Sequence, residues 1–295
     1  MKIIKCILFC CISLILSSCL GEDRSDCPTA RLTFSYLGDT NDPAMFANNI
    51  HFVTLMVYNK NQQLVMTREL SKHDLMNFQG VTLALASGNY QIICWGNINQ
   101  HNEQLSGHES LLVGRLHHSS LTTDRQIPTN SHLYYGSYQL EIPEKRFAEG
   151  DIRFCGAHIN MEIFVRNMSA SNAPNKWPVI EAHNLMPQYN MEMKSAMPYA
   201  TTYYPETEYN TDWRVHQILF QTLNFGDDNP VIINLKDNNG ISKCKVDLKQ
   251  YMADNKISVD DKNEATVPIL FEFTDVGVEI KLPEWIVNNV DPETR

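Results

Sequence analysis

Hydrophobic positions alternate with polar ones in short runs along most of the chain. Ala30 to Leu37 places Leu32, Phe34 and Tyr36 on one face, which is the pattern of a half-buried strand. Ile50 to Tyr58 is rich in β-forming residues on both faces and predicts a strand at the centre of a sheet. Further strands are predicted at residues 64–70, 81–85, 90–95, 111–116 and 133–142.

The same kind of pattern resumes after a charged segment, Glu144 to Asp151, where we place a domain boundary. Ile152 to Val165 predicts a long strand. Residues 167–212 then contain five prolines and little periodicity, which is typical of a functional loop or of a segment that hides short strands. The remaining predicted strands are 213–223, 231–235, 244–248, 266–273 and 276–282. The chain therefore predicts an all-β protein with two tandem β-sandwich domains, residues 30–148 and 149–295.

The first residues carry a separate signal. Two lysines precede an apolar run of roughly ten residues, within the ~7–15 of a signal-peptide core and too short to span a bilayer. Leu16-Ser-Ser-Cys19 follows and resembles the lipobox of bacterial lipoproteins. The resemblance implies cleavage before Cys19 and acylation of its thiol and new amino group, which gives a signal peptide (1–18) and a lipidated tether (19–29). An ordinary secretory signal and an uncleaved anchor are the alternatives.

The net charge of the chain disfavours one class of binding partner. The chain has 24 basic and 34 acidic residues, and residues 1–18 hold two of the lysines and no acid. The remainder therefore has 22 basic residues against 34 acidic ones, a formal charge of −12. Nucleic-acid binding depends on Lys and Arg that neutralise phosphates, so this charge argues against a nucleic acid as partner. The acidic residues from Glu22 to Asp26 resemble the surface-export signal of Bacteroidota lipoproteins.

Four cysteines remain beyond the lipobox: Cys27, Cys94, Cys155 and Cys244. An even number in an exported protein suggests disulfides, and four cysteines allow three pairings. With the boundary near residue 148, pairing within domains gives Cys27–Cys94 and Cys155–Cys244. Free buried cysteines are the alternative.

No motif in the sequence identifies an enzyme. The chain lacks a Gly-rich phosphate loop, a GxSxG elbow and an HExxH helix. Histidines are dense over residues 101–132, but their spacing does not match a helical metal site, so we expect solvated histidines. The acidic turns at 227–229 and 260–261 lack EF-hand spacing. We therefore expect no catalytic residue, no metal and no cofactor.

An aromatic segment supports an alternative function. Residues 199–213 contain Tyr199, Tyr203, Tyr204, Tyr209 and Trp213. Such rings stack on sugars or form protein interfaces, or they pack onto their own sandwich, which we favour. A surface glycan-binding lipoprotein of a nutrient-uptake system is therefore an alternative, and a secreted hydrolase is another.

Several short motifs follow the lipobox in an order that resembles a known family. They are Asp26-Cys-Pro28, Ser87-Gly-Asn-Tyr90, Cys94-Trp-Gly-Asn97 and Leu133-Tyr-Tyr-Gly136. Their order resembles the FimB-type fimbrial anchor family of Bacteroidota over nearly the whole mature chain. The resemblance implies two transthyretin-like, Greek-key β-sandwich domains and attachment to the outer membrane at the cell surface. It also implies a role in holding the fimbrial rod and ending its growth.

The implied partners are the fimbrial stalk subunits. Such fimbriae are thought to join subunits by strand addition, in which an extended segment completes a neighbour's sheet. A subunit anchored at Cys19 cannot lose its N-terminal segment without losing the anchor, so we expect the groove that cleavage opens in stalk subunits to stay closed here. The candidate donor is Val276 to Arg295, although residues 276–282 also fit a strand of the domain's own sheet. Its apolar side chains include Val276, Val278, Ile280, Leu282, Trp285, Ile286 and Val287.

Overall fold

The structure, a computed structural model, describes residues 27–98, 102–121, 126–168, 177–195 and 200–287. The signal peptide and Cys19 lie outside the described residues, as does the end of the chain after Val287. Most of the described elements are strands arranged in sandwich-like layers, which confirms the predicted all-β class. No helix within the described ranges is long and apolar enough to cross a membrane.

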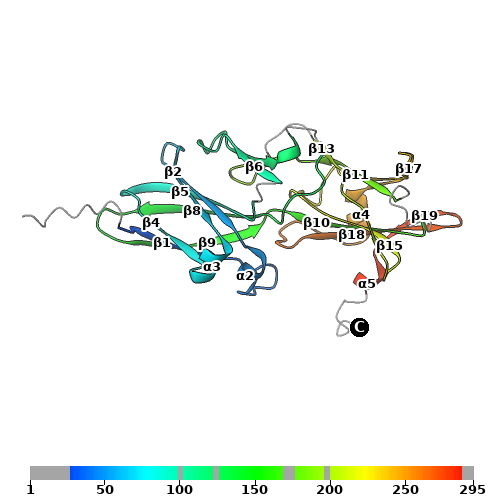
Figure 1. Cartoon of the computed structure of the whole chain (residues 1–295), viewed down its shortest axis with the longest axis horizontal. Helices are drawn as coiled ribbons and strands as arrows, with labels where there is room; N and C mark the ends of the chain where they lie inside the picture. The colour runs from blue at the N-terminus through cyan, green and yellow to red at the C-terminus, as the bar shows by residue number, and fades with distance from the viewer. Residues whose placement is uncertain (1–26, 99–101, 122–125, 169–176, 196–199, 288–295) are drawn as a thin grey trace, which may run out of the picture.

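A seven-stranded sheet forms the first half, in the order β3-β2-β5-β8-β9-β1-β4 (Figure 1). Its strands are β1 (Ala30–Ser35), β2 (Val53–Asn59), β3 (Leu64–Leu70), β4 (Gly80–Leu83), β5 (Gly88–Gly96), β8 (Tyr134–Ile142) and β9 (Ala148–Gly156). The β8–β9 pairing is limited to three register pairs, Tyr134↔Gly156 to Gly136↔Phe154, so the sheet divides there into two layers. Side chains from both layers, such as Leu32 and Leu55, meet in one core. The short helices α2 (Met45–Asn49) and α3 (Lys72–Asn77) add Phe46 and Leu75 to it.

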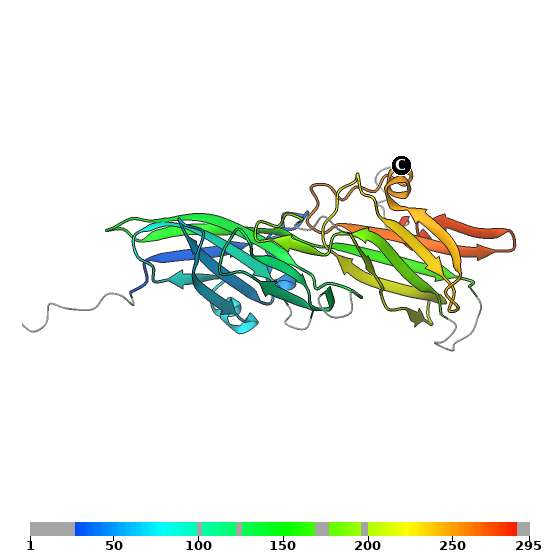
Figure 2. The ribbon, with the colours of Figure 1, turned by 90° about the horizontal axis from the view of Figure 1, so that it is seen from above.

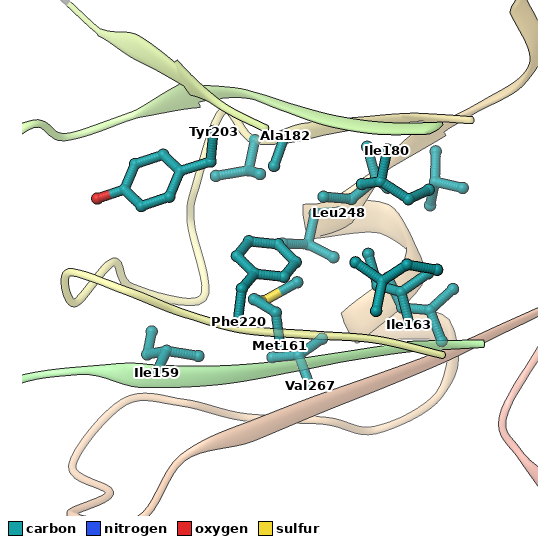
Figure 3. Close-up of a cluster of buried hydrophobic side chains, with 14 of the residues drawn as sticks. Ile159, Met161, Ile163, Ile180, Ala182, Tyr203, Phe220, Leu248 and Val267 are labelled. Carbon is teal, nitrogen blue, oxygen red and sulfur yellow. The ribbon is translucent and has the colours of Figure 1, made fainter. Parts of the chain in front are cut away.

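Two facing sheets form the second half. The five-stranded sheet has the order β14-β15-β10-β18-β19, and the four-stranded sheet has the order β13-β11-β16-β17. Their elements are β10 (Ile159–Arg166), β11 (Val179–Leu185), β13 (Thr201–Tyr203), β14 (Glu208–Asn210), β15 (Val215–Thr222), β16 (Ile232–Lys236), β17 (Ser242–Asp247), α4 (Leu248–Asp254), β18 (Thr266–Thr274), β19 (Gly277–Lys281) and α5 (Glu284–Val287). Figure 3 shows Met161 and Phe220 of one sheet facing Ala182 of the other, with Leu248 of α4 beside them.

The two halves lie end to end in an elongated molecule (Figure 2). Each half also contributes a short segment to the other. A third sheet, β12-β7-β6, combines β6 (Glu103–Ser106) and β7 (Arg115–His118) with β12 (Gln188–Asn190), which lies beyond β10 in the chain. It covers the outer face of the first sheet, where Tyr189 stacks on Trp95 at 5.7 Å between ring centroids. In the opposite direction, Ile127 is part of the second core.

These pairings cross the predicted domain boundary. β9 spans residues 148–156 and pairs with β1 over six residues, so a division after residue 148 separates it from its sheet. The strand predicted at 152–165 is in fact two strands, β9 and β10, which belong to different halves. The region 167–212 does hide short strands, β11 to β14, and residues 103–106 form a strand that was not among those predicted.

Adjacent residues on β15 provide a matched test of the second core. Phe220 is fully buried, whereas Leu219 is 51% exposed on the other face of the strand. Phe220→Ala leaves a cavity and should lower the free energy of unfolding by ~3–5 kcal/mol. Leu219→Ala should change it by less than ~0.5 kcal/mol. Urea denaturation followed by circular dichroism measures both variants, and equal losses would contradict the assigned strand facing.

Candidate functional site

The first strand of the fold lies in a slot between two neighbours. β1 alternates between buried and exposed residues, as the sequence predicts. Leu32 is fully buried, and Phe34 and Tyr36 are 2% and 1% exposed. Phe34 packs edge-on against Phe154 of β9, at 5.6 Å between ring centroids. One face of β1 therefore fills part of the first core.

Both edges of β1 are hydrogen-bonded. It runs antiparallel to β4, from Ala30↔Leu83 to Thr33↔Gly80, and parallel to β9, from Ala30↔Ala148 to Ser35↔Arg153. Gly80 permits the close approach of β4, because a Cβ there would lie 2.2 Å from the carbonyl oxygen of Leu32.

Polar contacts fix both ends of β1. Before the strand, the backbone N–H of Thr29 donates to the carbonyl of Leu83 at 2.8 Å, and its hydroxyl accepts from the N–H of Leu85 at 2.8 Å. At the far end, the N–H of Phe34 donates to the carbonyl of Gln79 at 3.0 Å, and the Gln79 amide donates back to the Phe34 carbonyl at 2.7 Å. These bonds set the register of β1 in the slot.

Removal of β1 would expose the apolar core and leave strand edges unpaired. Burial of a Leu or Phe side chain contributes ~1.5–3 kcal/mol, and a vacant slot would expose the core surface that such side chains cover. It would also leave two strand edges, those of β4 and β9, without backbone partners. An extended segment with alternating apolar side chains is the chemical complement of such a groove. In this structure, β1 of the same chain occupies the slot between β4 and β9.

The predicted donor segment is partly built into the second half. β19 pairs antiparallel with β18, from Leu270↔Lys281 to Thr274↔Gly277, so it is an edge strand of its own sheet. Val276 is 93% exposed at the hairpin, Val278 packs against the second core, and Ile280 is 37% exposed. Leu282 follows β19 and is partly buried, whereas Ile286 and Val287 lie in α5.

Trp285 ties the segment after β19 to the outer face of the five-stranded sheet. Its ring lies 5.2 Å from that of Phe164 and 5.3 Å from that of Trp213, and the Arg166 guanidinium lies 5.4 Å from its centroid. The chain up to Trp285 therefore packs against its own domain.

The four cysteines are free in the structure, and neither predicted disulfide is formed. Cys27 is exposed ahead of β1, and Cys94 is buried in the first core, where burial raises the pKa of its thiol. Cys155 lies on β9 and Cys244 on β17, in different halves, so the assumption of pairing within one domain fails for them. Burial also raises the pKa of both thiols.

The histidine-rich segment is more buried than expected. His117 and His118 are 8% and 4% exposed on β7, because β6 and β12 flank that strand. His132 instead contacts His158, with 3.2 Å between Nδ1 and Nε2, and burial lowers the pKa of His158 to about 4. In the part of the chain that the structure describes, no three His, Cys, Asp or Glu side chains form a metal-binding group.

The aromatic segment divides into buried and exposed rings. Tyr203 is fully buried in the second core, and Tyr209 packs on His216 at 5.1 Å. Tyr204 and Trp213 remain 38% and 48% exposed, and Tyr199 lies outside the described residues. The described part of the segment therefore packs largely onto its own sheets.

A comparison with protein-family models identifies the family of the chain. The family model of the fimbrillin-A associated anchor proteins Mfa1 and Mfa2 matches residues 24–291. The chain belongs to the Mfa2 anchor family. The match covers the slot, β1 and both cores, and it confirms the fimbrial anchor family expected from the order of the sequence motifs. No curated protein matches this Mfa2-family chain.

Solved structures confirm the fold of this Mfa2-family chain. The fimbrial anchor protein Mfa2 from Porphyromonas gingivalis is 14% identical with a TM-score of 0.61, over 86% of this chain and 95% of that one. A candidate adhesin from Bacteroides ovatus is 13% identical with a TM-score of 0.70, over 87% and 93%. A candidate polysaccharide-binding protein from Bacteroides thetaiotaomicron is 13% identical with a TM-score of 0.69, over 86% and 98%.

Proposed function

We propose that this Mfa2-family protein is a lipid-anchored subunit of the outer membrane that attaches a fimbria to the cell surface and ends its growth. The family membership supports an association with fimbriae. The lipobox ending at Cys19 supports cleavage there and acylation, and the acidic residues that follow support export to the surface. The two halves would act as tandem transthyretin-like units without catalytic chemistry, and the partners are the fimbrial stalk subunits.

The occupied slot carries the proposal that growth ends at this subunit. β1 fills the groove between β4 and β9 with its buried face, and it is continuous with the tether from Cys19. Removal of β1 by cleavage between strand and body would detach the protein from its lipid. The slot therefore stays closed to a strand from another subunit for as long as the anchor is intact.

The same arrangement favours a contact with the stalk at the other end of the chain. β19 and Trp285 are committed to the second half, so the donor would lie after Trp285 rather than at residues 276–282. Ile286, Val287 and Val290 would supply its apolar side chains. Main-chain hydrogen bonds to a stalk subunit would give affinity, and these side chains would fix register.

Controlled release of β1 tests the closed slot. A protease site inserted between Thr40 and Asn41, both exposed, would cut the chain after β1 without removing any core residue. After cleavage and mild denaturant, we expect the protein to take up a fimbrial subunit or its donor peptide, because the slot can then open. Gel filtration with mass spectrometry measures the uptake.

The matched control has the same protease site between Asp23 and Arg24, ahead of β1. This cut also severs the tether, but it leaves β1 joined to the body, so no uptake is expected. Equal uptake by the two cleaved proteins, or by uncut protein, would contradict a slot closed by β1.

Truncation tests the donor segment. A chain that ends at Trp285 keeps the ring contacts of that residue and lacks all three donor side chains, so it should fold with an unchanged urea midpoint. Cells that carry it should release their fimbriae into the medium, because the strand offered to the stalk is missing. A control that lacks residues 292–295 keeps Val290 and should retain fimbriae. Normal retention by the longer truncation would disprove the donor role, and immunoblots of cells and medium measure both.

A further inference from the structure

The segment directly after β1 binds the second half of the molecule. The Asp39 carboxylate accepts hydrogen bonds from the backbone N–H groups of Asn263, at 2.9 Å, and Glu264, at 3.1 Å. The hydroxyl of Tyr36 donates to the Glu264 carboxylate, and that of Tyr134 does so at 3.4 Å. Bonds of this kind, to charged acceptors, are the stronger ones in proteins. Residues 263–264 lead directly into β18.

Backbone packing holds the same loop in place. The N–H of Gly156, at the end of β9, donates to the Asn263 side-chain carbonyl at 3.3 Å. A Cβ at Gly156 would lie 1.9 Å from the backbone oxygen of Asn263, so this close approach requires glycine. The loop before β18 therefore rests on the ends of both β1 and β9.

The electrostatics of the junction fit a fixed contact between the exposed Asp39 and the half-buried Glu264. Burial raises the pKa of Glu264, the nearby Asp39 charge adds to the rise, and the two tyrosine hydroxyls oppose it. Burial of Asp39 is outweighed by the donors from Asn263 and Glu264, which hold the pKa of Asp39 below its usual range. Asp39 is therefore ionised at neutral pH, so both of its backbone bonds are charge-assisted.

The direction of the strands determines how a pull on the tether is resisted. β1 and β9 are parallel in six register pairs, and both run from the outer end of the first half toward the junction (Figures 1 and 2). β9 continues into β10, and β18 runs parallel to β10 away from the junction. A pull on Cys27 away from the second half is therefore directed along β1. It loads the interstrand bonds together, rather than opening them one by one.

We propose that residues 36–39 and 263–264 form a mechanical clamp that transmits a pull on the tether from β1 to the second half. The clamp holds the trailing end of β1, so β1 cannot slide out of its slot until the Asp39 bonds break. Only the origin of the load rests on the proposed anchoring function. The clamp itself is a property of the isolated, folded protein.

Single-molecule pulling on the mature chain tests the clamp without membrane or fimbria. One handle is attached to Cys27, and the other to an Asn239→Cys variant in the exposed β16–β17 turn, with Cys19, Cys155 and Cys244 replaced by Ala. At a fixed force, Asp39→Asn should raise the rate of the first extension step, the release of β1, by about tenfold or more, because charge-assisted bonds are lost. The later unfolding step of the second half should keep its rate.

Asp42→Asn is the matched control on the same loop. The Asp42 carboxylate accepts a local bond from the Ala44 N–H at 2.9 Å, so its release rate should equal that of the parent. Gly156→Ala, which forces the Asn263 loop away, should accelerate release as Asp39→Asn does. Release of β1 at the same rate in the parent, Asp39→Asn and Gly156→Ala would overturn the clamp. The pulling experiment uses the isolated protein, so its result does not depend on whether cells keep their fimbriae. The clamp and the proposed anchoring function can therefore be disproved independently.

Discussion

The burial of β1 between β4 and β9 holds the first half of the molecule together. The strand contributes the side chains of Leu32 and Phe34 to the first core. Its backbone is also the hydrogen-bonding partner of two other strands, β4 and β9. It is also the first element after the tether. The segment that completes the fold is therefore the one that would connect it to the membrane, and a protein that loses it loses both. Under the proposed anchoring, completion of the fold and attachment would depend on the same segment.

The two halves are joined more closely than two independent sandwiches in sequence would be. Ile127 enters the second core, and β12 pairs with β7 on the face of the first sheet. At the end of β1, Asp39 and Tyr36 reach the loop before β18. These contacts make the molecule a continuous rod between tether and C-terminal hairpin. Such continuity suits a subunit that stands between a membrane and a long filament.

Local pattern predicted the strands well but not their partners. Alternation located β1, β2, β5, β8 and β18, because each has one or two buried faces that the sequence displays. It could not show that β1 pairs in parallel with β9, since such a pairing joins residues more than a hundred positions apart. β6 was missed because Glu103 and Gln104 give it a polar sequence, although Glu103 is 2% exposed.

The extent of β9 and the contacts of Asp39 could not be predicted from local sequence, for related physical reasons. Charged residues from Glu144 suggested a linker, but they form the turn that leads into β9, whose exposed face is itself charged. The order of motifs identified the anchor family, yet the clamp at Asp39 could not be foreseen. A single Asp in a turn carries no sequence signal for an acceptor of two distant amides. Its role follows from how the halves meet.

In the proposed function, β1 stays in its slot while the protein holds a fimbria. A disulfide between β1 and β4 tests this directly. Arg31 and Thr82 lie opposite each other on β1 and β4, and both are exposed, so Arg31→Cys with Thr82→Cys places two thiols for a disulfide in a Cys27→Ser background. Cells with the oxidised variant should retain fimbriae of normal number and length. If these cells instead lose their fimbriae, and reduction of the disulfide restores them, then β1 must leave its slot and the proposed closed slot is wrong.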